Sequence, residues 1–394
     1  MPHEQSSPAT PALISRTEEL QTLCNKLSAL PFITVDTEFM REHTYYSKLC
    51  LIQLGAIIDK KVEGYLIDPL SPDIDLSSFL ELMTNDRVVK VFHAARQDLE
   101  TIWNIGQILP EPLFDTQVAA AVCSFGESVS YEQLVNDLTG NRIDKSSRFT
   151  DWSQRPLKPE QIRYALSDVT HLVAIYTALN ERLEKSGRSF WVQEEMAALL
   201  SPSLYEMKPE DAWQRLAGRM RKQKDIPILV EVAAWREKEA QSRNVPRGRI
   251  LKDDVVADIA SAAPKDADDL KQLRSLPRGF ENSKYASAIL DAVQRGQKNL
   301  SSSGYKLPIH KRKESSALTE LLKVLLKSVS EKEGVAARII ASQEDLYDLA
   351  CHESETNPLL SGWRRQIFGE QALALKSGKS ALTVRKKKIV IIPT

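Results

Sequence analysis

The chain has 394 residues with 53 basic and 53 acidic side chains, so its formal net charge at neutral pH is zero. This length exceeds one ordinary domain, and a hydrophobic content of 42% is enough for two or three packed cores. No apolar run approaches the ~20 residues of a membrane helix, and the first residues lack the basic start and apolar stretch of a secretory signal. We therefore expect neither a membrane protein nor a secreted one.

Residues 1–13 are expected to form a disordered lead-in, and residues 14–200 an α/β domain. Ser15 and Glu18 have the spacing of a capping box, which predicts a helix that ends near residue 29. Apolar, β-rich runs predict strands at 32–39, 48–57, 64–69 and 87–95. Helical patterns follow, and the longest covers residues 159–185. Strands followed by helices, with one βα crossover, predict a mixed sheet covered by helices.

The second half of the chain is predicted to be helical. We expect one compact helical unit over residues 208–296, a linker over 301–316 and a second helical unit over 317–382. In both units a long helix is followed by short ones, which suggests a degenerate duplication. Residues 383–394 form a basic tail that combines a cationic segment with one apolar strand and has no predicted role.

Charge is distributed unevenly along the chain. Residues 1–200 contain 18 Lys and Arg against 28 Asp and Glu, whereas residues 201–394 contain 35 against 25. An acidic half joined to a basic half indicates a metal-binding catalytic unit and a separate unit that binds a polyanion. Charge variation without functional meaning is the alternative.

The four cysteines, Cys24, Cys50, Cys123 and Cys351, are far apart in the sequence and form no C-x-x-C pair. We expect buried thiols in a reducing compartment rather than disulfides or zinc ligands. A cytoplasmic location is the simplest interpretation.

Four carboxylates and one tyrosine lie in or beside stretches that should be core. Asp36 and Glu38 are two residues apart on a predicted strand, so both side chains leave the same face. Asp98 starts a helix after the fourth predicted strand, at the carboxyl end where α/β sheets bind ligands. Tyr164 and Asp168 are one helical turn apart and share a face.

Each of these signals is weak alone, because solvated strands, helix dipoles and ordinary amphipathic helices produce the same patterns. Together they need a common explanation, since an unpaired buried carboxylate is costly to desolvate. Hard divalent cations prefer oxygen ligands and would neutralise a clustered acidic set. The sequence therefore predicts a two-metal site.

In order and residue type these segments resemble the exonuclease motifs of the DEDD superfamily, in its tyrosine-bearing (DEDDy) branch, and within it the ribonuclease D family. DTEF at 36–39 is similar to the first motif, HAARQDLE at 93–100 to the second, and YALSDV at 164–169 to the third. The resemblance covers residues 30–180 and implies an RNase H-like exonuclease domain. Residues 208–287 resemble the helicase-and-RNase-D C-terminal (HRDC) domain, and the resemblance of 317–382 to that domain is weaker.

This resemblance implies an enzyme that hydrolyses RNA from the 3′ end, releases 5′-mononucleotides and trims tRNA precursors. Asp36 is expected to bridge two divalent ions, Glu38 and Asp168 to complete one ion site, and Asp98 to help hold the other. Tyr164 is expected to orient the attacking water, because a phenol with a pKa near ~10 is a poor base at neutral pH. We expect Mg²⁺, with Mn²⁺ as a substitute.

Further residues are candidates for contact with nucleic acid. Phe39 and Met40 follow the first motif and are placed to stack on or wedge terminal bases, with core packing as the rival for Phe39. His93 is a candidate substrate contact or a strand-end histidine satisfied by the backbone. Basic side chains of the first helical unit are expected to give salt-sensitive affinity for phosphates. They are Arg219, Arg221, Lys222, Lys224, Arg236, Lys238, Arg243, Arg247, Arg249 and Lys252.

Two other functions remain open at this stage. One is a DNA-directed 3′–5′ exonuclease of the same superfamily, although the HRDC-like pair favours RNA. The other is a catalytically silent RNA-binding protein, although all four carboxylates are present. No obligate protein partner is evident from the sequence.

Overall fold

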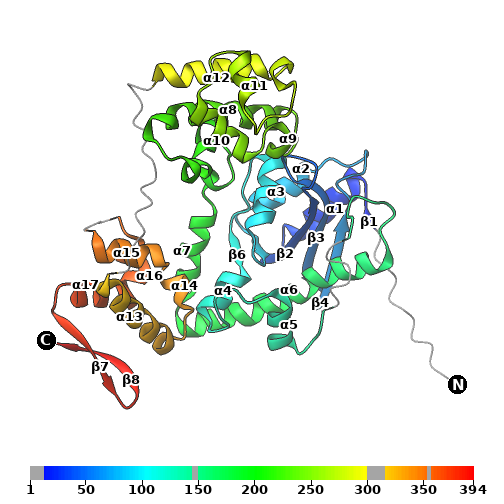
Figure 1. The fold of residues 1–394 in the computed structure, drawn as a ribbon. Coiled ribbons are helices and arrows are strands. Elements are labelled where there is room, and N and C mark those ends of the chain that lie inside the picture. Colours follow the sequence, from blue (N-terminus) through cyan, green and yellow to red (C-terminus); the bar gives the residue numbers. More distant parts are fainter. Residues whose placement is uncertain (1–12, 144–149, 300–315, 353–355) are drawn as a thin grey trace. The chain divides into compact units, whose positions relative to one another are not determined.

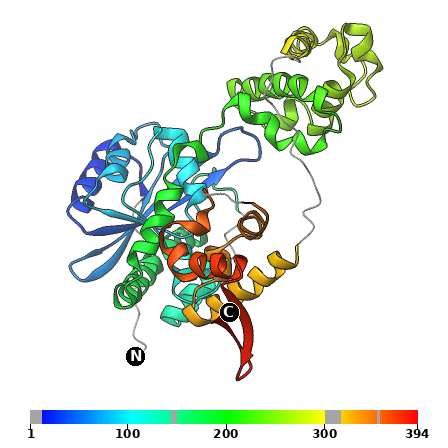
Figure 2. The same cartoon turned by 90° about the vertical axis from the view of Figure 1, so that its left-hand side faces the viewer.

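The computed structural model describes residues 13–143, 150–299, 316–352 and 356–394. The chain divides into two compact units (Figure 1, Figure 2). Unit 1 comprises Met1–Phe39, Leu49–Ser201 and Lys313–Thr394, and unit 2 comprises Met40–Lys48 and Pro202–Arg312. The predicted lead-in and the predicted 301–316 linker lie outside the described residues, apart from Leu13 and Ser316.

Unit 1 is built on a six-stranded mixed sheet with the strand order β1-β4-β3-β2-β5-β6. The strands are β1 (Leu13–Ile14), β2 (Phe32–Met40), β3 (Lys48–Ile58), β4 (Lys61–Ile67), β5 (Val89–Phe92) and β6 (Leu113–Asp115). β3 and β4 form an antiparallel hairpin, whereas β2, β5 and β6 are parallel. The predicted mixed sheet is confirmed, and the strand that carries Asp36 and Glu38 lies inside it with neighbours on both sides.

In the described residues 13–143 and 150–201, the part of unit 1 that forms the sheet also has seven α-helices. They are α1 (Thr17–Leu27), α2 (Ser77–Thr84), α3 (Arg96–Gly106), α4 (Thr116–Val122), α5 (Tyr131–Thr139), α6 (Pro159–Ser186) and α7 (Ser189–Leu199). The long helix predicted at 159–185 is α6, which packs against β4 and β5. β1 and β6 were not predicted, because strands of two or three residues are too short to show a period of two.

The predicted capping box at Ser15 is wrong. The N-cap of α1 is Arg16, which makes no side-chain capping hydrogen bond. Leu13 and Ile14 pair with β4, so the chain is still leaving a strand at Ser15 and the helix begins only at Thr17. The Thr17 hydroxyl instead donates to the backbone oxygen of Asp73 at 3.0 Å.

The C-terminal helices also belong to unit 1. They are α13 (Ala317–Glu333), α14 (Ala337–Ile340), α15 (Gln343–Cys351), η7 (Pro358–Leu360), α16 (Gly362–Arg364), the π-helical turn η8 (Arg365–Gly369) and α17 (Glu370–Lys376). The Trp363 ring stacks on Trp191 of α7 with centroids 4.7 Å apart, and Arg364 pairs with Glu195 at 2.6 Å. Because Trp363 is fully buried, this contact forms part of the core of unit 1.

The basic tail differs from its prediction. One strand was expected after residue 383, whereas the structure has a two-stranded hairpin of β7 (Ser380–Arg385) and β8 (Lys388–Pro393). Its first strand begins before the predicted tail and carries only weak alternation, so the pairing is visible only in three dimensions.

Unit 2 is helical, as predicted. Its elements are η1 (Pro202–Leu204), η2 (Pro209–Arg215), η3 (Ala217–Arg219), η4 (Gln223–Asp225), α8 (Ile226–Ser242), α9 (Arg247–Ile250), α10 (Asp253–Ala262), α11 (Ala267–Gln272), η5 (Phe280–Asn282) and α12 (Ala286–Lys298). α8, α9 and α10 have 17, 4 and 10 residues, and α13, α14 and α15 have 17, 4 and 9. This shared order of lengths supports the suggested duplication.

None of the four cysteines forms a disulfide. Cys24 and Cys50 are buried, but the expectation of burial is wrong for Cys351, which is exposed at the end of α15. Among the described residues, no helix combines the length and the apolar character needed to cross a bilayer.

Candidate active site

Three of the predicted carboxylates converge in unit 1. Asp36 and Glu38 lie on β2, and Asp168 lies on α6. Each of the three residues has one carboxylate oxygen that lies within 4.8 Å of a carboxylate oxygen of the other two. Asp168 is buried and the other two are half-buried. These three residues are called the acidic set below.

A close approach of α6 to the sheet places Asp168 beside β2. The Thr34 hydroxyl of β2 donates to the backbone oxygen of Val169 at 2.8 Å. A Cβ at Gly55 of β3 would lie 2.3 Å from Thr34 Oγ1 and 2.7 Å from the Val169 oxygen. Only glycine fits there without moving the helix, so Gly55 helps to bring the acidic set together.

Tyr131 of α5 also holds α6 at this point. Its hydroxyl donates to the backbone oxygen of Asp168 at 2.5 Å and lies 3.2 Å from that of Ser167. Burial, followed by the nearby carboxylates of Asp168 and Asp36, raises the pKa of Tyr131. The phenol therefore remains a hydrogen-bond donor at neutral pH.

Asp98 is buried beside the acidic set but is not a member of it. Its Oδ1 atom accepts hydrogen bonds from the backbone N–H of Thr37 at 3.1 Å and from the Thr37 hydroxyl at 2.5 Å. Burial, and then repulsion from Asp36, raises the pKa of Asp98. Asp36 and Asp98 are therefore close enough for their charges to repel each other. Thr37, which lies between Asp36 and Glu38 in the sequence, fixes the Asp98 carboxylate through these two hydrogen bonds.

Asp115 orders the turn that leads into α3 and so to Asp98. Its two carboxylate oxygens accept the N–H groups of Ala94 at 3.0 Å and Ala95 at 2.8 Å, where Ala94 has a left-handed φ of 57°. The same carboxylate caps α4 through the N–H of Gln117 at 2.8 Å. Asp115 was not among the predicted site residues, although an aspartate directly before a helical run is an N-cap signal.

Tyr164 lies one turn before Asp168 on α6 and hydrogen-bonds its carboxylate. Burial, followed by the charges of Asp168, Glu38 and Asp36, raises the pKa of Tyr164 well above its usual range. The hydroxyl stays protonated at neutral pH, so it can donate a hydrogen bond but cannot act as a base. Trp152 packs near the phenol ring, with centroids 6.0 Å apart.

The electrostatics of the site fit a bound cation. Burial raises the pKa of Asp36 to about 7. Within the described ranges, no lysine, arginine or histidine forms an ion pair with Asp36 or Asp98. A set of oxygen donors whose negative charge the chain leaves partly uncompensated matches the ligand preference of hard divalent ions.

Three other predicted residues lie near the first two motifs. Phe39 and Met40 end β2 and are half-buried. His93 Nδ1 lies 2.9 Å from the Thr116 hydroxyl, and burial lowers the His93 pKa. Its Nε2 atom has no hydrogen-bond partner in the part of the chain that the structure describes.

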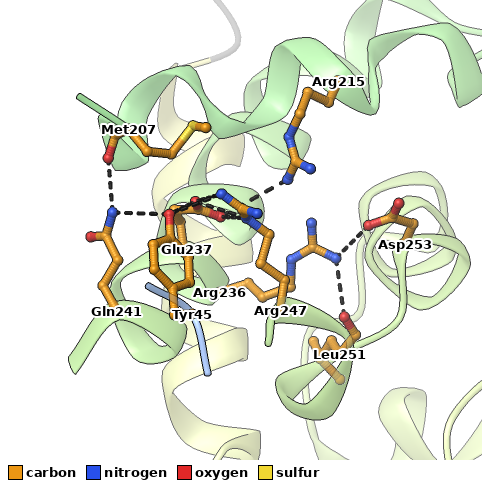
Figure 3. A network of polar contacts seen from close by, with 9 residues as sticks. All are labelled: Tyr45, Met207, Arg215, Arg236, Glu237, Gln241, Arg247, Leu251 and Asp253. Atoms are coloured by element: carbon orange, nitrogen blue, oxygen red, sulfur yellow. Dashed lines mark hydrogen bonds and ion pairs between the residues drawn. The ribbon is translucent and has the colours of Figure 1, made fainter. Parts of the chain in front are cut away.

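The basic side chains of unit 2 differ in their availability. The expectation of phosphate contact is wrong for Arg236, whose fully buried side chain donates to the Leu251 oxygen at 3.0 Å and to Asp253 at 2.7 Å (Figure 3). Arg247 is also engaged, since its guanidinium makes hydrogen bonds of 2.6 to 2.8 Å to Glu237. Arg243 pairs with Glu239.

Arg249, unlike Arg243 and Arg247, forms no ion pair with a carboxylate of the described residues. Its Nη2 lies 3.0 Å from Nδ1 of His43, and its side chain is exposed. The structure therefore separates these arginines into Arg247, which is held inside unit 2, and Arg243 and Arg249, which are nearer to solvent.

Comparisons with known proteins agree with this geometry. A family model described as a 3′–5′ exonuclease matches residues 11–184, and a model of the HRDC domain matches residues 227–293. Ribonuclease D of Nitrobacter hamburgensis is 50% identical over 382 residues, which are 96% of this chain and 98% of that protein. Ribonuclease D of Bartonella henselae is 45% identical over 380 residues, 96% of this chain and 93% of that protein.

A solved structure is similar over nearly the same length. The crystal structure of Escherichia coli RNase D, described as an exoribonuclease involved in structured RNA processing, has a TM-score of 0.80 to this chain at 28% identity. The similarity covers 93% of this chain and 98% of that chain.

Proposed function

The chain belongs to the ribonuclease D family of 3′–5′ exoribonucleases, and we propose that the acidic set with Asp98 and Tyr164 is its catalytic centre. The observation that carries this proposal is the convergence of carboxylates from β2 and α6, which are 130 positions apart in sequence (Glu38 to Asp168), within 4.8 Å. Enzymes of this superfamily use divalent metal ions, and the donor set supports the same requirement here.

We propose two ions, with Mg²⁺ as the natural metal and Mn²⁺ as a substitute. Asp36, Glu38 and Asp168 would hold one ion, and Asp36 with Asp98 the other. When bound, the ions stabilise the attacking and leaving oxygens of an in-line displacement at phosphorus.

The chain's own residues hold the reacting groups in place. Tyr164 stays protonated and donates its hydroxyl proton to Asp168, so its oxygen would accept a hydrogen bond from the attacking water and orient it. Thr37 fixes the Asp98 carboxylate, and Tyr131 fixes the α6 backbone at Asp168. Hydrolysis at the last phosphodiester would release a 5′-mononucleotide.

The remaining sequence predictions form part of this proposal. The α/β part of the chain, residues 14–200, would be the exonuclease domain, with HRDC-type domains at 208–296 and 317–382. Phe39, Met40 and His93 would contact the 3′ end, and Arg243 and Arg249 would contact RNA phosphates. The predicted substrate class is the tRNA precursor, and the predicted location is the cytoplasm.

The test is digestion of a 3′-extended tRNA precursor in the presence of Mg²⁺, with products identified by mass spectrometry. We expect stepwise loss of mononucleotides from the 3′ end, and no loss when EDTA is present. A DNA oligonucleotide of matched sequence is the control. Faster digestion of the DNA, or internal cleavage of the RNA, would contradict the proposal.

A further inference from the structure

The β7–β8 hairpin carries a concentration of positive charge that the proposed active site does not use. Its strands pair antiparallel, and a two-residue turn of Lys386 and Lys387 joins them. The hairpin is fixed to its own unit close to the turn, since the Ser328 hydroxyl of α13 donates to the oxygen of Ile389 at 2.9 Å, and Ile389 with Val384 is the register pair next to Arg385 and Lys388. The two strands form a narrow two-stranded ribbon (Figure 1).

Four consecutive cations form the tip of this ribbon: Arg385, Lys386, Lys387 and Lys388. We call them the basic tip. All four are exposed, and within the described ranges none of them forms an ion pair with a carboxylate. After Glu370 the sequence contains six Lys and Arg residues and no Asp or Glu. The positive charge therefore faces solvent without compensation.

This arrangement is locally unfavourable. Lys386 and Lys387 have φ angles of 49° and 64°, a left-handed conformation that favours Asn and Gly and disfavours residues with long side chains. Arg385 and Lys388 are direct register partners across the two strands. Like charges at opposed positions destabilise a hairpin, so the charge is present despite a cost to the fold.

A second hairpin in the same unit shows that the turn does not require this charge. Asp59 and Lys60 join β3 to β4 with φ angles of 49° and 64°, the same values as in the β7–β8 turn. There an acidic residue stands first, and the register pair that closes the turn is Ile58 with Lys61. The same backbone geometry is thus formed without four adjacent cations.

Protection against edge-to-edge aggregation does not explain the basic tip either. Lysines that serve this purpose stand along the edge of a strand, where they block pairing with another chain. In this hairpin the strand positions below the tip, residues 380–384 and 389–393, contain no charged side chain. The cations are concentrated at the end of the ribbon instead.

We propose that the basic tip binds phosphates of a double-helical segment of the RNA substrate. This inference rests on the proposed function, which makes RNA the substrate of the unit that carries the hairpin. The hairpin contains no aromatic side chain on which an unpaired base could stack, which favours backbone contact with a helical stem over capture of a single strand. Contacts of this kind are independent of sequence and sensitive to salt.

The experiment removes the charge while keeping the hairpin. The double substitution K386N/K387G installs the pair that this turn prefers, and R385T/K388T replaces the flanking cations by a strand-forming residue. Binding of the full-length protein to a fluorescent RNA stem-loop with a 3′ tail is measured in EDTA between 50 and 200 mM salt. The matched control is K60Q/K61Q, which removes two lysines from the tip of the β3–β4 hairpin.

The quadruple variant is expected to bind the stem-loop about ten- to a hundredfold more weakly near 0.1 M salt. The slope of log Kd against log salt should fall by about three, because each phosphate contact contributes about 0.9. K386N/K387G should give about half of that change in slope, whereas K60Q/K61Q should leave it unaltered. Affinity for an unstructured RNA of equal length should change less than about threefold.

An unchanged slope for the quadruple variant, or an equal loss with the unstructured RNA, would overturn the inference. Loss of binding to phosphatidylserine vesicles with unaltered stem-loop binding would overturn it in favour of a lipid surface. Digestion of a short single-stranded RNA in Mg²⁺ separates the two proposals. If the parent protein does not digest this RNA, the proposed function fails. If the parent and the quadruple variant digest it equally and also bind the stem-loop equally, only the proposal for the basic tip is refuted.

Discussion

The acidic set of unit 1 and the surroundings of Glu237 in unit 2 both place carboxylates near a tyrosine, but they differ in whether an arginine neutralises the negative charge. In unit 2, fully buried Glu237 accepts hydrogen bonds from Arg247 and from the Tyr45 hydroxyl (Figure 3). Burial alone would raise the pKa of Glu237, but these hydrogen bonds outweigh burial and hold the pKa below its usual value. The charge is compensated within the fold.

The network around Glu237 also satisfies its other members. Arg247 lies over the Tyr45 ring with 4.6 Å to its centroid, and Gln241 donates to the Tyr45 hydroxyl at 3.2 Å. Asn244 accepts the backbone N–H groups of Tyr45 and Tyr46, each at 3.0 Å. This network thus fixes the 40–48 segment within unit 2.

Asp36 of the acidic set has no such cationic partner among the described residues, and burial raises its pKa. A buried acid with an internal cation contributes to stability, whereas a buried acid without one is costly and indicates a site prepared for an external ligand. The pKa values of Asp36 and Glu237 are therefore shifted in opposite directions, although both carboxylates lie near a tyrosine.

The substitution with the largest expected effect is Asp36→Asn, which tests whether Asp36 serves catalysis rather than stability. We expect the rate of RNA digestion to fall by about a thousandfold or more, because the amide removes a charged ligand from the centre of the site. Metal-free stability should rise or stay constant, since the substitution removes an uncompensated charge. Initial rates and thermal denaturation in EDTA measure the two effects. A lower melting temperature in EDTA without a lower rate of RNA digestion would show that Asp36 stabilises the fold and is not needed for catalysis.

The opposite result is expected for Glu237→Gln. Removal of one partner from a buried ion pair leaves Arg247 unpaired, and such changes cost about 3 kcal/mol. Denaturant unfolding measures the loss. Asp254→Asn is the control, because Asp254 pairs with Arg219 at an exposed position and should change the free energy of unfolding by less than about 1 kcal/mol. An equal loss of unfolding free energy in Glu237→Gln and Asp254→Asn would show that the buried ion pair of Glu237 contributes no more to stability than an exposed one.

Gly55→Ala tests whether the acidic set depends on the close approach of α6. The added methyl group would meet the backbone oxygen of Val169, which cannot rotate away. A shift of α6 would misplace Asp168, and we expect kcat to fall by up to about a hundredfold. Gly64→Ala is the matched control, since its Cβ would meet the end of the flexible Leu166 side chain. A larger loss for Gly64→Ala would contradict this geometry.

The smallest expected effect is a difference in pH dependence of the metal-free protein. Asp36 has a raised pKa of about 7, so the folded state binds the proton more tightly and its stability rises as pH falls from 7 towards 4. Glu237 has a lowered pKa, so its contribution is complete above about pH 4.5 and is lost below that value.

The melting temperatures of the parent and Asp36→Asn should therefore converge between pH 8 and pH 5 in EDTA. The difference between the parent and Glu237→Gln should stay constant over that range. Parallel curves for the parent and Asp36→Asn would show that Asp36 carries no raised pKa.

The sequence was sufficient for the features that depend on local pattern. Alternating and helical periods located β2, β3, β4, β5 and the long α6. The spacing of Asp36 with Glu38 and of Tyr164 with Asp168 assigned each pair to one face. The same local information failed at Ser15, where pairing of the two preceding residues with β4 delays the start of α1.

Only the tertiary structure decided which groups meet. It joined β2 to α6 through Thr34 and Gly55, buried Arg236 and engaged Arg247 with Glu237, and left the four cations of the basic tip exposed. The reason is physical: periodicity reports the face on which a side chain lies, whereas its partner, burial and charge balance depend on which other segments of the chain pack against that face.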